Sequence, residues 1–227
     1  MTILSKVISK VKTLIEYAKW GMFICKAING EVSDEVCPPK AFSNMYKGRY
    51  ATQLTINNHI WLNYTKKFSS PYVTDFGGSN CLGSVVEVID LPNCINVGDY
   101  QWSGANKSLK VLKLSGLRYA GISFTQNCSA LEYVEFGALT GMPTTLFTGS
   151  KATMKEIYVG ERTACNLHFQ QCPNLIQESL HDIIDKVADR TGESALTLYV
   201  HQEAYDRISE EYKTKLSNKN WNLAVGS

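Results

Sequence analysis

The chain has 227 residues, enough to bury a sizeable core, and charged residues make up 19% of it. Its formal net charge is +2, far below the positive charge typical of nucleic-acid-binding proteins, so no nucleic-acid partner is expected. No stretch approaches the ~20 consecutive apolar residues of a membrane span.

Residues 1–30 predict an amphipathic helix for docking or oligomerisation. Apolar residues recur at alternating spacings of three and four, as in a heptad seam, and others widen the stripe. Capping of the first repeat and contact with a membrane surface through the lysine-bearing face are the alternatives. Lysines also interrupt any apolar run, so we expect no signal peptide and no export by a standard route. The predicted assembly residues are Leu4, Val7, Ile8, Val11, Leu14, Ile15, Ala18 and Met22.

Residues 31–49 are predicted to form a linker or irregular arm. This stretch contains the adjacent prolines Pro38 and Pro39 and shows little hydrophobic period. It would separate the helix from the repeats that follow.

Residues 50–175 contain an internal repeat. The segments "VVEVIDL", "SLKVLKL", "ALEYVEF" and "TMKEIYV" superpose on Val86, Leu109, Leu131 and Met154, which lie 23, 22 and 23 residues apart. An LxxLxL core with such a period is typical of a leucine-rich solenoid. Counted from the aligned residue, the first, fourth and sixth positions should point inward and stack on neighbouring repeats. An aromatic residue closes each repeat, namely Trp102, Phe124, Phe147 and Phe169.

Charges on the strands test this alignment independently. The residues after the aligned positions are Glu87, Lys110, Glu132 and Lys155, which alternate in sign. Three positions further on lie Asp90, Lys113, Glu135 and Tyr158, which alternate for three repeats. An in-register parallel sheet would place opposite charges side by side, so the pattern predicts such a sheet.

The stretch "VVEVIDLPNCINVGDYQWSGANKSL" resembles a BspA-type leucine-rich repeat. Leu91-Pro92-Asn93, Gly98-Asp99-Tyr100 and Trp102-Ser103-Gly104 carry the match, and the later repeats are divergent copies. The resemblance implies a β-rich α/β fold, a right-handed solenoid with repeats of 22–23 residues. The resemblance also implies that the chain is a protein of gut bacteria or their phages. It says little about activity, because such repeats serve many binding roles.

Residues 176–227 predict a helical cap that would cover the end of the repeats. Leu180, Ile183, Ile184 and Val187 share one helix face, with Gly192 as a stop. The segment "ALTLYV" predicts a strand, residues 202–216 a second helix, and "NWNLAV" a last strand.

No catalytic, metal-binding or cofactor-binding residue is predicted. The chain has no Walker loop, GxGxxG, GxSxG or HExxH motif, so we expect no enzyme and no cofactor. His181 and Asp185 are spaced as half a metal site, but a solvated helix face is the preferred interpretation. The seven cysteines include no zinc-knuckle pair, and Cys128 and Cys172 fall at one repeat position, which suits buried thiols.

The outward strand positions form the candidate binding surface, and Tyr133 and Tyr158 suit stacking on a sugar or a partner protein. The alternative is that this face only keeps the sheet soluble. We expect a structural or adhesion protein of a phage virion, assembled in the host cytoplasm, whose partners are virion proteins, copies of itself, or a host-surface protein or glycan. A bacterial cell-surface adhesin or interaction module is the alternative. The candidate residues are Lys110, Lys113, Tyr133, Glu135, Glu156 and Tyr158.

Overall fold

The computed structural model describes residues 4–12, 53–54, 66–69, 73–76, 86–99, 107–126, 128–147, 149 and 152–226. The predicted linker at 31–49 therefore lies outside the described residues. So do Leu14, Ile15, Ala18 and Met22 of the predicted assembly stripe, and the predicted repeat aromatic Trp102.

Parallel strands one repeat apart form the largest sheet. In order across the sheet, its strands are β2 (Lys67–Ser69), β4 (Val88–Asp90), β6 (Val111–Leu114), β7 (Tyr133–Phe136) and β8 (Glu156–Tyr158). The register joins residues 23, 22 and 23 positions apart, as the aligned repeats predict. One column across the sheet is Val88, Val111, Tyr133 and Glu156, and another is Asp90, Lys113, Glu135 and Tyr158.

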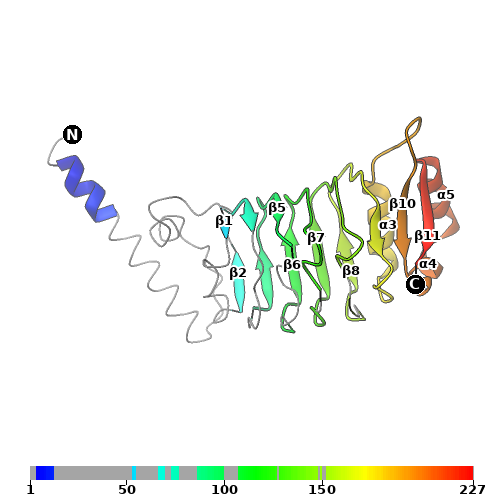
Figure 1. Ribbon diagram of the computed structural model, residues 1–227, viewed down its shortest axis with the longest axis horizontal. Helices are drawn as coiled ribbons and strands as arrows, with labels where there is room; N and C mark the ends of the chain where they lie inside the picture. The colour runs from blue at the N-terminus through cyan, green and yellow to red at the C-terminus, as the bar shows by residue number, and fades with distance from the viewer. Residues whose placement is uncertain are drawn as a thin grey trace.

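Two smaller parallel sheets use other parts of the chain. The first contains β1 (Gln53–Leu54), β3 (Asp75–Phe76) and β5 (Asn96–Val97), and single bridges extend its pairing to Tyr119 and Gly141. The second has the order β11 (Trp221–Val225), β10 (Leu196–Val200) and β9 (Leu167–Phe169). The strands follow one another in a row along the long axis of the molecule (Figure 1).

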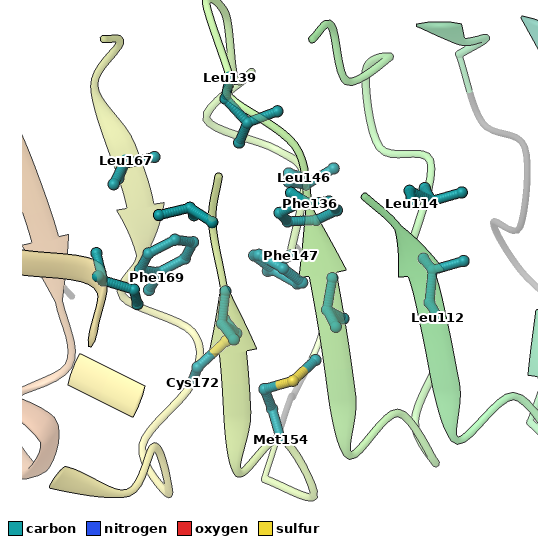
Figure 2. Close-up of a cluster of buried hydrophobic side chains, with 14 of the residues drawn as sticks. Leu112, Leu114, Phe136, Leu139, Leu146, Phe147, Met154, Leu167, Phe169 and Cys172 are labelled. Atoms are coloured by element: carbon teal, nitrogen blue, oxygen red, sulfur yellow. The ribbon is translucent and has the colours of Figure 1, made fainter. Parts of the chain in front are cut away.

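The core lies on the inner side of the repeats. Every inward position predicted from the four aligned segments is buried, with at most 2% exposure. Phe147 lies between Phe136 and Phe169, with ring centroids 6.3 and 5.9 Å away (Figure 2). Burying one such side chain contributes roughly 1.5–3 kcal/mol, so this aromatic column is a main source of stability. The buried repeat positions are Val86, Ile89, Leu91, Leu109, Leu112, Leu114, Leu131, Val134, Phe136, Met154, Ile157 and Val159.

Glycines allow successive repeats to approach closely after β7 and β8. Gly160 N–H donates a hydrogen bond to the Gly137 carbonyl over 2.9 Å. A Cβ atom on Gly160 would lie 2.4 Å from the Ala138 nitrogen, closer than any side chain can be placed. The two repeats can therefore keep this spacing only with glycine at position 160.

The capping helix begins near its predicted position but ends earlier. Helix α3 (Gln177–Lys186) buries Leu180, Ile183 and Ile184 against the sheet, as the apolar stripe predicts. Val187 then leaves the helix in an extended conformation and forms a bridge with Thr163. Gly192, the predicted stop, instead has a φ of 82° in the turn before β10. The bridge between Val187 and Thr163 therefore ends the helix at Lys186, and Gly192 is not required as a helix stop.

The single helix predicted for residues 202–216 is wrong, because the structure contains two helices there. They are α4 (Gln202–Arg207) and α5 (Glu210–Asn218). Ile208 is buried and extended between them, and Ser209 Oγ accepts a hydrogen bond from Tyr212 N–H over 3.5 Å as the N-cap of α5. The helical spacing of apolar residues continues from α4 into α5. Periodicity alone therefore cannot reveal the break between the two helices.

Residues 4–12 are helical, and their apolar stripe is exposed. The exposed fractions are 69% for Leu4, 51% for Val7, 46% for Ile8 and 49% for Val11. The apolar side chains of this part of the helix are therefore largely open to solvent. In the part of the chain that the structure describes, no helix is both long and apolar enough to cross a membrane.

Candidate binding face

Five of the six predicted binding residues lie together on one outer face of β6, β7 and β8. Tyr133 and Glu135 alternate with buried residues along β7, and Glu156 and Tyr158 do so along β8. Lys113 stands beside Glu135 in the register. Because side chains two residues apart share one face of a strand, the sheet gathers these groups side by side.

Each tyrosine of this face donates a hydrogen bond to a glutamate on its own strand. Tyr133 Oη lies 3.2 Å from Glu135 Oε2, and Tyr158 Oη lies 3.0 Å from Glu156 Oε2. Ser115 Oγ donates a second hydrogen bond to Glu135, at 2.7 Å from Oε1. Both oxygens of Glu135 are therefore held by neutral hydroxyl groups.

The two tyrosine rings lie next to each other, and a lysine lies over each. Their centroids are 5.5 Å apart with an interplanar angle of 42°. Lys113 Nζ is 5.5 Å from the centroid of Tyr133, and Lys186 Nζ is 5.8 Å from that of Tyr158. These distances allow cation–π attraction.

This arrangement differs from the second charge ladder that the sequence predicts. Asp90, Lys113 and Glu135 are neighbours in the register, yet no ion pair joins them among the described residues. Lys113 lies over the Tyr133 ring instead, and Glu135 binds hydroxyl groups. Tyr133 lies next to both charges and competes for each of them, because its ring attracts Lys113 and its hydroxyl binds Glu135.

Burial and the nearby carboxylates keep both phenols protonated. Burial is the main cause that raises the pKa of Tyr133, and the charge and hydrogen bond of Glu135 raise it further. Burial also raises the pKa of Tyr158, followed by the hydrogen bond to Glu156. At neutral pH both tyrosines are therefore uncharged hydrogen-bond donors.

A pocket of about 430 Å³ opens at the carboxyl ends of β7 and β8. The sequence did not point to three of its polar and charged residues, Ser115, Glu161 and Lys186. Ser115 directly follows β6 and Glu161 lies three residues after the end of β8, so their positions in the repeats could have suggested them. Lys186 comes from α3, and only the tertiary structure brings it here. The polar and aromatic residues that line the pocket are Ser115, Tyr133, Glu135, Phe136, Tyr158, Glu161 and Lys186.

The sixth predicted residue, Lys110, belongs to the charge ladder that precedes the strands. Glu87 lies between Lys66 at 3.4 Å and Lys110 at 3.3 Å, and Lys155 lies 3.8 Å from Glu132. The hydrogen bond from Lys110 is the main cause that lowers the pKa of Glu87. Exposed ion pairs contribute about 0–1 kcal/mol each, so the ladder supports the register more than the stability.

The cysteines that the structure describes belong to the hydrophobic core. Cys94, Cys128, Cys165 and Cys172 are buried, and burial raises the pKa of Cys165 to about 12. A thiol with so high a pKa is not a nucleophile at neutral pH.

His181 and Asp185 also have other partners. The imidazole stacks on Tyr212 with centroids 3.6 Å apart and accepts a hydrogen bond from Ser209 N–H, while Asp185 pairs with Lys215. Within the described ranges, no three histidine, cysteine or acidic side chains are placed to hold a metal ion.

The described face thus combines aromatic rings, carboxylates and hydroxyl donors beside a pocket large enough for a side chain or small organic group. Such a combination suits non-covalent recognition of a chemically complementary group. Comparison with known proteins adds no further assignment, because no protein-family model, curated protein or solved structure matches this chain.

Proposed function

We propose that the protein is a non-enzymatic binding protein built as a right-handed leucine-rich solenoid. Two observations support this architecture: parallel pairing between residues 22 or 23 positions apart, and burial of every aligned repeat position. Repeats of this kind bury their apolar side by stacking and leave the outer face free for a partner. The C-terminal helices would close the stack, and the N-terminal helix would serve assembly.

The observation that carries the binding role is the clustering on the outer face of β6, β7 and β8. Two tyrosines and two glutamates are fixed there by mutual hydrogen bonds rather than left as independent solvated side chains. Preorganised side chains beside a pocket lose little entropy when a partner binds. A face that served only solubility would gain nothing from this order.

The setting that we propose is a phage virion, in which the protein is a fibre, decoration or tail-associated component that binds a host or partner surface. The similarity of the repeats to BspA-type sequences of gut bacteria and their phages supports this setting. A bacterial cell-surface adhesin or interaction module is the second candidate, because the same outer face would serve either.

Locating the protein distinguishes the two settings. Phage particles would be purified by density gradient from lysates of a culture that carries the gene, and the chain quantified by mass spectrometry. Constant stoichiometry with the capsid protein across the particle peak would support the virion. Absence from particles, together with release of its peptides by protease treatment of intact cells, would contradict the virion and favour the adhesin.

The assembly role of the N-terminal helix has its own test. We propose that a second copy of this chain covers the exposed stripe of residues 4–12, because its heptad spacing suits a helix of the same sequence. Light scattering of the full-length protein should give a multimer, and Val7→Lys with Val11→Lys should reduce its mass. Ser5→Lys with Ser9→Lys, which adds the same charge outside the seam, should not. A monomeric wild-type protein would rule out self-association.

A further inference from the structure

We propose that the pocket at the carboxyl ends of β7 and β8 binds a guanidinium or ammonium group, held by the Glu135 and Glu161 carboxylates beside the Tyr133 and Tyr158 rings. This inference rests on the proposed binding function of the same face and names the chemistry of its ligand. The cationic group would be an arginine or lysine side chain of a partner protein or a free organic cation.

Negative charge at the pocket lacks a cationic partner. Glu135 accepts hydrogen bonds only from the Ser115 and Tyr133 hydroxyls, and no lysine or arginine among the described residues lies within ion-pairing distance of it. The Glu161 side chain likewise has no ion pair with a described residue. Two carboxylates that line the pocket therefore have no cationic partner among the described residues, and a cation there would gain charge-assisted hydrogen bonds.

The nearby lysines do not form ion pairs with the Glu135 and Glu161 carboxylates. Lys186, which lines the pocket, is 2.9 Å from Asp182 and so already has an acidic partner. Lys113 lies over the Tyr133 ring. The charged residues that line the pocket are Glu135, Glu161 and Lys186, which together give a formal charge of −1.

The tyrosines favour the same ligand. The face of an aromatic ring attracts cations, and the chain's own Lys113 and Lys186 already occupy such positions. Both phenols donate hydrogen bonds to carboxylates, which polarises the O–H bonds and increases the electron density of the rings. A guanidinium group can lie over a ring and at the same time donate paired hydrogen bonds to a carboxylate.

Other ligand classes fit less well. An anion would meet the unpaired carboxylates of Glu135 and Glu161. The pocket volume of about 430 Å³ easily holds one arginine side chain.

The test titrates the full-length protein and follows the backbone amide of Gly160, which lines the pocket, by nuclear magnetic resonance. The probes are agmatine, a short arginine peptide and the same peptide with citrulline, a neutral isostere of arginine. Agmatine and the arginine peptide should bind, and the citrulline peptide should bind about tenfold more weakly or worse. Equal binding of both peptides would overturn the proposal, as would binding of methyl glycosides without agmatine.

The carboxylate requirement is tested with matched variants. Glu135→Gln and, separately, Glu161→Gln should each weaken agmatine binding by about tenfold. Glu132→Gln, which removes a carboxylate that pairs with Lys155 in the ladder, should change it less than about twofold. Unchanged binding in both pocket variants, with their thermal unfolding unaltered, would overturn the proposal.

The two sources of the cation give different affinities. An arginine peptide that binds at least tenfold more tightly than agmatine would identify a protein partner, whereas equal binding would identify a free organic cation. These titrations are independent of the particle experiment. Loss of cation binding would therefore leave the proposed virion location standing, and absence from particles would leave the pocket chemistry standing.

Discussion

The Ser179 hydroxyl forms hydrogen bonds with both backbone polar groups of Ile157, as a neighbouring strand would. Its Oγ accepts a hydrogen bond from Ile157 N–H at 2.8 Å and donates one to the Ile157 carbonyl at 2.7 Å. Ile157 lies in β8, the last strand of the five-stranded sheet. A strand edge exposes unpaired backbone groups, and here one side chain of α3 satisfies both of them in the fully buried interior.

Replacing Ser179 should therefore destabilise the junction between the repeats and the cap. Ser179→Ala leaves a buried N–H and a buried carbonyl without partners, and we expect a loss of about 1–3 kcal/mol in the free energy of unfolding. Urea denaturation measures this loss. Ser217→Ala, on the exposed side of α5, is the control and should change stability by less than about 0.5 kcal/mol. Equal effects of the two substitutions would refute the strand-substitute role.

The close approach of repeats at Gly160 predicts intolerance of any side chain. Gly160→Ala would place its methyl group 2.4 Å from a backbone nitrogen that cannot move without shifting a repeat. We expect destabilisation of about 3 kcal/mol or more, at the upper end of overpacking effects. Gly141→Ala is the matched control, because its Cβ would meet only the Tyr119 ring at 3.6 Å. Thermal unfolding should separate the two variants clearly, and similar melting temperatures would count against the argument.

Lys219 should be important for the cap because its ammonium group closes the end of α3. Nζ donates to the carbonyls of Ile184 at 3.0 Å, Asp185 at 2.6 Å and Val187 at 3.0 Å. Lys219→Met keeps the length of the side chain but loses these charge-assisted bonds, and we expect a loss of about 1.5–3 kcal/mol. Lys215→Met, which breaks an exposed ion pair with Asp185 and a contact of the ammonium group with the Tyr212 ring, should cost about 0–1 kcal/mol. Chemical denaturation compares the two, and a larger loss for Lys215→Met would contradict this account.

The half-buried imidazole of His168 predicts a dependence of stability on pH. It stacks on Tyr199 with centroids 4.8 Å apart, and burial lowers its pKa below the ordinary value of 6.5. The unfolded chain then binds a proton that the folded chain does not. Stability is thus lost as the pH falls from about 6.5 through the lower folded-state pKa.

The substitution His168→Phe isolates this contribution, because phenylalanine keeps an aromatic ring against Tyr199 but cannot titrate. Denaturation midpoints would be measured from neutral pH down to mildly acidic pH. We expect a steeper decline for the wild-type protein than for the variant over this range. Parallel pH profiles would show that His168 has no part in it.

The repeat period and its buried positions were open to prediction because they depend on local patterns that recur. Leu112, Val134 and Ile157 each meet equivalent residues of adjacent repeats, so aligning the segments also predicts their register. The stripe of Leu180, Ile183 and Ile184 predicted α3 for the same reason. The ends of helices were less predictable, since Val187 and Ile208 leave helical geometry through contacts with distant residues or a local cap.

By itself, the sequence determined the 22–23-residue register, the inward leucine positions and the tyrosines and glutamates that share an outer face. Only the tertiary structure decided which partner each of those polar groups takes. Glu135 binds Ser115 and Tyr133 rather than Lys113, and Lys186 arrives from α3 to complete the pocket. The physical reason is that burial of apolar side chains follows their periodic order along the chain, whereas hydrogen bonds and ion pairs depend on distances of a few ångströms between atoms that the fold brings together.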